Sequence, residues 1–270
     1  IFFHSAILFV PGGIPLIQND QTSDLLSWLV SFTSEFRLHL LFLVSGFGIS
    51  FSVKSRSVQG MLAERRRRLL LPLIFGILFI VPPMVYWEKQ FLGEYLGSFW
   101  QFYPDFFVGV YPSGNFSWHH LWFLVYLYLF CELFSKLFHK LDSPKVTSVI
   151  NGMFSRFGDY SVILYILPLF LVEILLRALF PGFRNLVMDW ASFSQWFLIF
   201  IAGYMIANHV FLLGAVVRKR RILLMIGIIS TFLLFEFFRL ESGRFYPGQP
   251  GATTIMEYLA FCLLRVVNSW

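Results

Sequence analysis

Long apolar runs separated by short basic loops are the feature that most constrains this chain. A membrane-spanning helix needs about 20 apolar residues, and only helices and closed barrels can cross a bilayer. The runs are too long and too uniformly apolar for barrel strands, so we predict an all-α, polytopic bundle of transmembrane helices. The predicted spans, about eight in number, cover roughly residues 1–17, 25–53, 69–87, 118–139, 160–180, 191–214, 221–240 and 252–270.

The composition supports a membrane protein. The 270 residues are 57% hydrophobic and only 13% charged, whereas soluble domains are about half apolar and a quarter charged. We expect one membrane domain over residues 1–270, because we find no internal repeat or low-complexity tract. Both ends stop inside apolar sequence, so we expect both to be trimmed and both terminal spans to be partial. Cys131 and Cys262 lie in apolar runs without zinc-site spacing, which predicts buried thiols and no metal site.

The basic residues predict the orientation. Cytoplasmic loops carry an excess of Lys and Arg, and every second loop here holds most of these residues. They are Lys54, Arg56, Arg65 to Arg68, Lys136, Lys140, Lys145, Arg156 and residues 218–221. Residues 11–24, 88–117, 181–190 and 240–251 are therefore predicted to face outward. The net charge of +6 thus reflects topology, and it argues against nucleic acid as a partner. The outward segment 88–117 predicts either an interfacial helix with a loop that caps a site, or an aromatic belt.

Ionisable groups inside spans are costly and mark candidate sites. His4 lies in the first run, where it can accept a proton near neutral pH or form an interhelical hydrogen bond. In the second run, Glu35 and His39 share a helix face, and Arg37 requires an anion, a carbonyl group or water nearby. Gly46 and Gly48 favour the close approach of another helix.

Two further motifs carry charge near span ends. His119 and His120 stand at the outer end of the fourth run beside Trp118 and Trp122, and Glu132 lies nearer its cytoplasmic end. In "ERRRRLLLP" (residues 64–72), four arginines precede an apolar run. Their total charge suffices for anchoring on the positive-inside rule. If the run is helical, Arg65 and Arg68 share a face and can grip a phosphate or carboxylate.

Taken together, these motifs resemble the acyltransferase 3 family of membrane O-acyltransferases. The resemblance rests on a histidine in the first span, "FRLHLLFLVSGF", "RRRRLLLPLIFG" and "HHLWFLVYLYL". Within the family, the sequence is most similar to the branch that contains the glucan-succinylating protein of osmoregulated periplasmic glucan synthesis. The family has about ten spans and carries a histidine that matches His4. Its Arg-x-x-Arg motif matches Arg65 and Arg68, and its His-Leu-Trp-Phe-Leu motif matches residues 120–124.

The resemblance implies an activity. An acyl group, of the acetyl or succinyl type, would pass from cytoplasmic acyl-CoA to a hydroxyl of a glycan or other carbohydrate at the outer face of a bacterial inner membrane. His4 would be the catalytic base or acyl relay, and Arg65 and Arg68 would bind the donor. His120, Trp122 and Arg37 would line the acceptor side. Acyl-CoA would be a co-substrate, and no permanently bound cofactor is expected.

Two other classes stay open from the residues alone. A secondary transporter or channel for a small polar solute would use the intramembrane His, Arg and Glu residues as a permeation path. Transporters often contain repeated halves with interrupted spans, and we find no such symmetry. A non-catalytic membrane scaffold would leave the intramembrane His and Arg residues unexplained.

Overall fold

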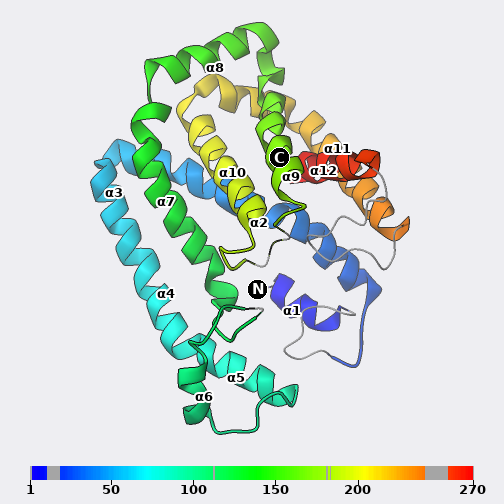
Figure 1. The fold of residues 1–270 in the computed structure, drawn as a ribbon. Coiled ribbons are helices and arrows are strands. Elements are labelled where there is room, and N and C mark those ends of the chain that lie inside the picture. The colour runs from blue at the N-terminus through cyan, green and yellow to red at the C-terminus, as the bar shows by residue number, and fades with distance from the viewer. Residues whose placement is uncertain are drawn as a thin grey trace.

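The computed structural model describes residues 2–10, 19–111, 113–180, 182, 184–240 and 255–269. All regular secondary structure in these residues is helical, which confirms the predicted all-α class (Figure 1). The α-helices are α1 (Phe2–Ala6), α2 (Asp24–Ser55), α3 (Val58–Arg65), α4 (Leu71–Phe75), α5 (Val81–Phe91), α6 (Phe99–Asp105), α7 (Trp122–Leu141), α8 (Pro144–Phe157), α9 (Ile166–Leu176), α10 (Trp190–Asn208), α11 (Val210–Leu240) and α12 (Ile255–Ser269). The 3₁₀ segments are η1 (Ile7–Phe9), η4 (His119–Leu121) and η5 (Gly158–Tyr165), and the π-helical segments are η2 (Arg66–Leu70) and η3 (Gly76–Ile80).

Five helical stretches of the described chain are long and apolar enough to cross a membrane, so this is an integral membrane protein. They are Asp24–Ser55, Val58–Phe91, His119–Leu141, Pro144–Leu176 and Trp190–Asn208. Each coincides with one predicted span. The predicted spans 1–17 and 252–270 extend outside the described residues, and 221–240 forms the second part of α11.

Several boundaries differ from the sequence prediction. The sixth span was predicted to end at residue 214, but α10 ends at Asn208, and α11 runs without a break through the predicted basic loop 218–221. The third span begins at Val58 and not at residue 69, because the Ser57 side chain caps the helix by accepting the Gly60 N–H at 3.1 Å. The arginine run therefore lies inside the helix. The predicted loop before residue 160 contains α8, which starts with Ser143 as its cap and Pro144 in its first turn.

The tightest helix crossing joins α2 and α10. A β-carbon at Gly46 would overlap the Phe200 carbonyl oxygen, and one at Gly203 would overlap the Leu43 carbonyl oxygen. Glycine at both positions lets the two backbones touch, which confirms the predicted close approach at Gly46. A β-carbon at Gly48 would meet nothing within 4 Å, so that part of the prediction was wrong.

The core beside this crossing is aromatic. The ring of Phe42 on α2 lies 4.8 Å from Phe123 and 5.0 Å from Phe130, both on α7, and 5.5 Å from Trp196 on α10. Trp196 also lies 5.0 Å from the Trp122 ring at the start of α7. Ring pairs at 4.5–7 Å add to the packing energy of the buried area. The cluster therefore fixes the start of α7 against α2 and α10.

The loops gather at two ends of the bundle. At one end, Trp118 Nε1 donates to the Arg184 carbonyl at 2.7 Å, and Asn185 Nδ2 donates to the Tyr111 carbonyl at 2.9 Å. The segments predicted to face outward therefore meet one another. At the other end, Arg218 bonds Asp159, which joins two segments predicted to be cytoplasmic. The grouping agrees with the predicted alternation, and which end faces the cytoplasm stays a prediction.

The outward-predicted segment 88–117 contains a short helix and a loop. Ser98 and Gln101 form a capping box at the start of α6. Phe102 and Phe106 are fully buried against Val81 and Val85 of α5. The segment is therefore packed on the third span. Trp100 and Tyr111 remain exposed on it, as in an aromatic belt, so features of both predicted alternatives are present.

Candidate functional site

His4 and His120 meet at the outward-predicted end of the bundle. The first short helix carries His4 to the start of α7, where its ring centroid lies 5.2 Å from that of His120. Both side chains keep exposed surface. Two histidines that are 116 positions apart in the sequence therefore lie side by side and open to a reactant. Imidazole side chains can accept, hold and return a proton.

Arg37 approaches the same histidine from α2. Its guanidinium carbon lies 3.4 Å from the centroid of the Phe3 ring, directly beside His4 in the sequence. Arg37 and His120 both act electrostatically on His4. Three of the residues predicted for the site, His4, His120 and Arg37, are thus brought together by three separate elements.

Trp122, predicted to contact the acceptor, is 8% exposed. Its ring packs on Tyr126 and Trp196, and the guanidinium carbon of Arg184 lies 5.0 Å from its centroid. Trp122 therefore lies beneath the site as a platform for Arg184. A role in direct acceptor contact stays a prediction.

The turn that carries His119 and His120 is held from several sides. His119 has a φ of 41°, which non-glycine residues adopt rarely. Its Nε2 lies 3.8 Å from Glu88 Oε2, and its ring stacks on His120 with centroids 6.0 Å apart. Gly76 of η3 makes room for Leu121, since a β-carbon there would overlap the leucine side chain. These contacts hold the His119–His120 turn in one conformation.

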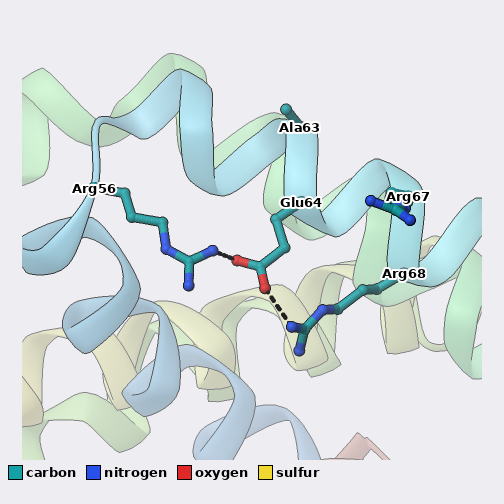
Figure 2. Close-up of a pocket in the computed structure, with 5 residues that line it drawn as sticks. All are labelled: Arg56, Ala63, Glu64, Arg67 and Arg68. Carbon is teal, nitrogen blue, oxygen red and sulfur yellow. Dashed lines mark hydrogen bonds and ion pairs between the residues drawn. The ribbon is translucent and has the colours of Figure 1, made fainter.

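Arg67 and Arg68 of the arginine run line a cleft near the other end of the third span (Figure 2). The cleft has a volume of about 730 Å³ and is lined by Arg56, Ala63, Glu64, Arg67 and Arg68. Glu64 pairs with Arg68 at 2.7 Å and also with Arg56. Three guanidinium groups and one carboxylate leave an excess of positive charge, which suits a polyanionic ligand.

The four consecutive arginines are not equivalent. Arg68 lines the cleft, but Arg65 does not; it is half-buried and acts electrostatically on Cys131 of α7. The expectation that Arg65 and Arg68 share one face is not met, because η2 is a π-helix. A π-turn takes more residues than an α-turn, so residues three apart point in different directions. Arg66 Nε bonds Glu132 Oε1 of α7 at 2.9 Å, so Arg66 ties the third span to α7.

A domain model of the acyltransferase 3 family, described as an acyltransferase domain, matches residues 1–269. The chain belongs to the acyltransferase 3 family. It is therefore a membrane-bound acyltransferase of an O-acyltransferase family. No curated protein and no solved structure matches the chain.

The acyltransferase also holds an ion network inside its spans. Glu173 of α9 is fully buried and accepts two hydrogen bonds from Arg177, at 2.9 and 3.1 Å. Arg265 of α12 pairs with the same carboxylate at 3.0 Å. Arg265 therefore links α12 to α9 through this carboxylate, while Arg177 pairs with it from four residues along the chain. The side chains of Glu35, Glu236 and Glu257 lie outside the described part of the structure.

Arg184 is a further candidate site residue, and the sequence alone did not point to it. It lies in the loop before α10, and it acts electrostatically on Arg37. The only signal in the sequence was a lone arginine in an outward-predicted loop, which resembles many surface arginines. Its contact with Trp122 depends on tertiary packing.

Proposed function

We propose that this acyltransferase moves an acetyl- or succinyl-type group from acyl-CoA to a carbohydrate hydroxyl. Acyl-CoA would enter from the cytoplasm at the arginine cleft, and the glycan would be acylated at the outer face of a bacterial inner membrane. The observation that carries the proposal is the convergence of His4, His120 and Arg37 at the start of α7. The arginine cleft lies toward the far end of the same helix.

The reaction would proceed through His4. His4 takes the proton of the acceptor hydroxyl, and the oxygen attacks the thioester carbonyl carbon. The C–S bond then breaks, the new C–O ester bond remains, and the thiolate of CoA receives the proton from His4. Alternatively, His4 carries the acyl group transiently before the hydroxyl takes it. In either route a negative charge develops on the carbonyl oxygen, and Arg37 is positioned to stabilise it.

The separation of the two sites suits a long donor. Arg66 bonds Glu132, which is twelve residues after His120. At 1.5 Å per residue this corresponds to roughly 18 Å along α7. The extended pantetheine arm of CoA is of comparable length. A nucleotide end held in the cleft would therefore leave the thioester near His4.

Donor binding is tested by thermal unfolding in the presence of acetyl-CoA and succinyl-CoA. A ligand that binds only the folded protein raises the melting temperature. We expect Arg68→Ala to weaken this effect far more than Arg66→Ala, since Arg68 lines the cleft, whereas Arg66 lies outside its lining and bonds Glu132. Arg65→Ala tests the predicted role of that residue in the same assay. Equal losses at Arg66 and Arg68 would favour a topology signal and remove the cleft from the donor site.

The role of His4 is tested by His4→Ala with His139→Ala as the matched control. His139 is exposed at the end of α7, away from His4. We expect His4→Ala to abolish acyl transfer while the protein stays folded, and His139→Ala to retain it. Near-normal turnover of His4→Ala would refute the assignment. Stabilisation by a small polar solute, with none by acyl-CoA, would instead favour a transporter.

A further inference from the structure

Arg184 is held on a rigid support at the start of α7, where His120 also lies. Its guanidinium lies over the Trp122 ring, and its carbonyl accepts the Trp118 indole N–H at 2.7 Å. The next residue, Asn185, is 7% exposed and ties the loop together. Its side-chain oxygen accepts the N–H groups of Val187 and Met188, and its amide donates to the Tyr111 carbonyl.

The backbone of this loop is in a costly conformation. Arg184 has a φ of 54° and Leu186 a φ of 63°, in the left-handed region that non-glycine residues rarely adopt. Each such residue costs on the order of 1–2 kcal/mol, and the surrounding bonds must hold it in place. The loop therefore fixes the direction of the Arg184 side chain before any ligand arrives.

Arg184 and Arg37 are two positive groups whose ring contacts lead to the same pair of histidines. Arg37 lies over Phe3, the neighbour of His4, and Arg184 lies over Trp122, two residues after His120. Arg184 also acts electrostatically on Arg37. Neither forms an ion pair with a carboxylate among the described side chains. Two fixed guanidinium groups with free donors provide a site for an anion.

One carboxylate oxygen of the acid behind Arg184 is already engaged. Asp189 is fully buried at the start of α10 and accepts the hydroxyl of Tyr126. Burial raises the pKa of the Asp189 carboxyl, and the Tyr126 hydrogen bond opposes that rise. Asp189 therefore steadies the loop from below, and it also acts electrostatically on Arg184.

We infer that Arg184 and Arg37 form a two-arginine subsite that binds an oxyanion next to His4 and His120. Within the proposed function, on which this role rests, the anion is the carbonyl oxygen that becomes negative when the hydroxyl attacks the thioester. Arg184 is then a catalytic residue, because it donates to the reacting oxygen. Fixed donors at such a position are effective since they need no reorganisation during the reaction.

Anion binding tests the subsite without acyl transfer. The starting protein is the double variant Arg67→Ala/Arg68→Ala, which removes two arginines of the cleft, and the probe is inorganic sulfate in thermal unfolding. We expect sulfate to stabilise this variant, and Arg184→Ala added to it to weaken sulfate binding at least tenfold. Arg220→Ala, an exposed arginine elsewhere, is the matched control and should change nothing. Undiminished stabilisation with Arg184→Ala overturns the inference.

The kcat and KM of acyl transfer provide the second measurement. Loss of one oxyanion donor lowers kcat about 10²–10³-fold, and we expect this for Arg184→Ala with little change in KM for acyl-CoA. Added guanidinium ion should restore part of the activity, which it would not do for a residue that only supports the fold. A change confined to KM, or a loss that guanidinium leaves untouched, contradicts the catalytic role. A wild-type protein that binds sulfate through Arg184 but transfers no acyl group refutes the proposed function and leaves the subsite standing.

Discussion

Substitution of Gly46 by alanine tests how closely α2 and α10 pack. A β-carbon at Gly46 would overlap the Phe200 carbonyl oxygen and lie 2.7 Å from its carbonyl carbon, where ordinary contacts begin at 3.4 Å. Both obstructing atoms belong to the backbone, so no side chain can rotate away. The helices must separate, and the aromatic packing of Phe42 on Trp196 must loosen with them.

Gly48 provides the matched control on the same helix. A β-carbon there meets nothing within 4 Å. Alanine favours a helix over glycine by about 0.5–1 kcal/mol, and this gain applies equally at both positions. The difference between the two variants therefore isolates the steric cost. Overpacking of a well-packed interior typically costs about 1–3 kcal/mol, and backbone obstruction places Gly46→Ala toward the upper end.

The assay is thermal unfolding of both variants under one detergent and lipid condition. On the scaling for domains of 150–250 residues, the expected difference is about 2–12 °C, with Gly46→Ala the less stable. Gly48→Ala should melt at or slightly above the wild-type temperature. Equal melting temperatures for the two variants would refute the backbone contact between α2 and α10.

Two further substitutions probe the interior and the histidine turn. Glu173→Gln should destabilise the protein by about 3–5 kcal/mol in chemical unfolding, because Arg177, which is 2% exposed, loses its carboxylate. The double variant Glu173→Gln/Arg177→Gln should recover part of that loss. An unchanged stability of the single variant would contradict a charged pair. Gly76→Ala should cost less stability than Gly46→Ala, since the new methyl group meets the flexible side chain of Leu121 and not backbone. Acyl transfer should nevertheless fall, because Leu121 adjoins His120. Full activity would show that the Gly76 contact does not position the turn.

Hydropathy predicted the helical class and five spans because the bilayer imposes both the helix and its length. The prediction at Gly46 also succeeded, since small residues in apolar runs serve close helix contacts. The same rule failed at Gly48, because spacing does not tell which side of α2 faces α10. Glycines in a span indicate that another helix can approach closely. Which glycine lies at the contact depends on tertiary packing.

The sequence predicted those candidate-site residues whose polar side chains are energetically costly inside a membrane span. His4, His120 and Arg37 are polar groups in apolar sequence, and the structure brings them together. Arg184 escaped prediction because an arginine in a polar loop costs little and gives no signal. Its importance follows from its position over Trp122, a contact between residues 62 positions apart.

The Glu64 carboxylate should weaken the binding of a polyanion in the arginine cleft. Its carboxylate pairs with both Arg56 and Arg68, so it competes with any polyanion that enters the cleft (Figure 2). Glu64→Gln should therefore tighten acyl-CoA binding by roughly two- to fivefold, since exposed ion pairs contribute up to about 1 kcal/mol. The gain should shrink as ionic strength rises. Glu94→Gln, which removes an acid paired with Lys89 in the outward-predicted segment, is the control and should leave binding unchanged. Weaker binding in Glu64→Gln would mean that the carboxylate orients the two arginines for the donor, and equal gains in both variants would mean that only net charge matters.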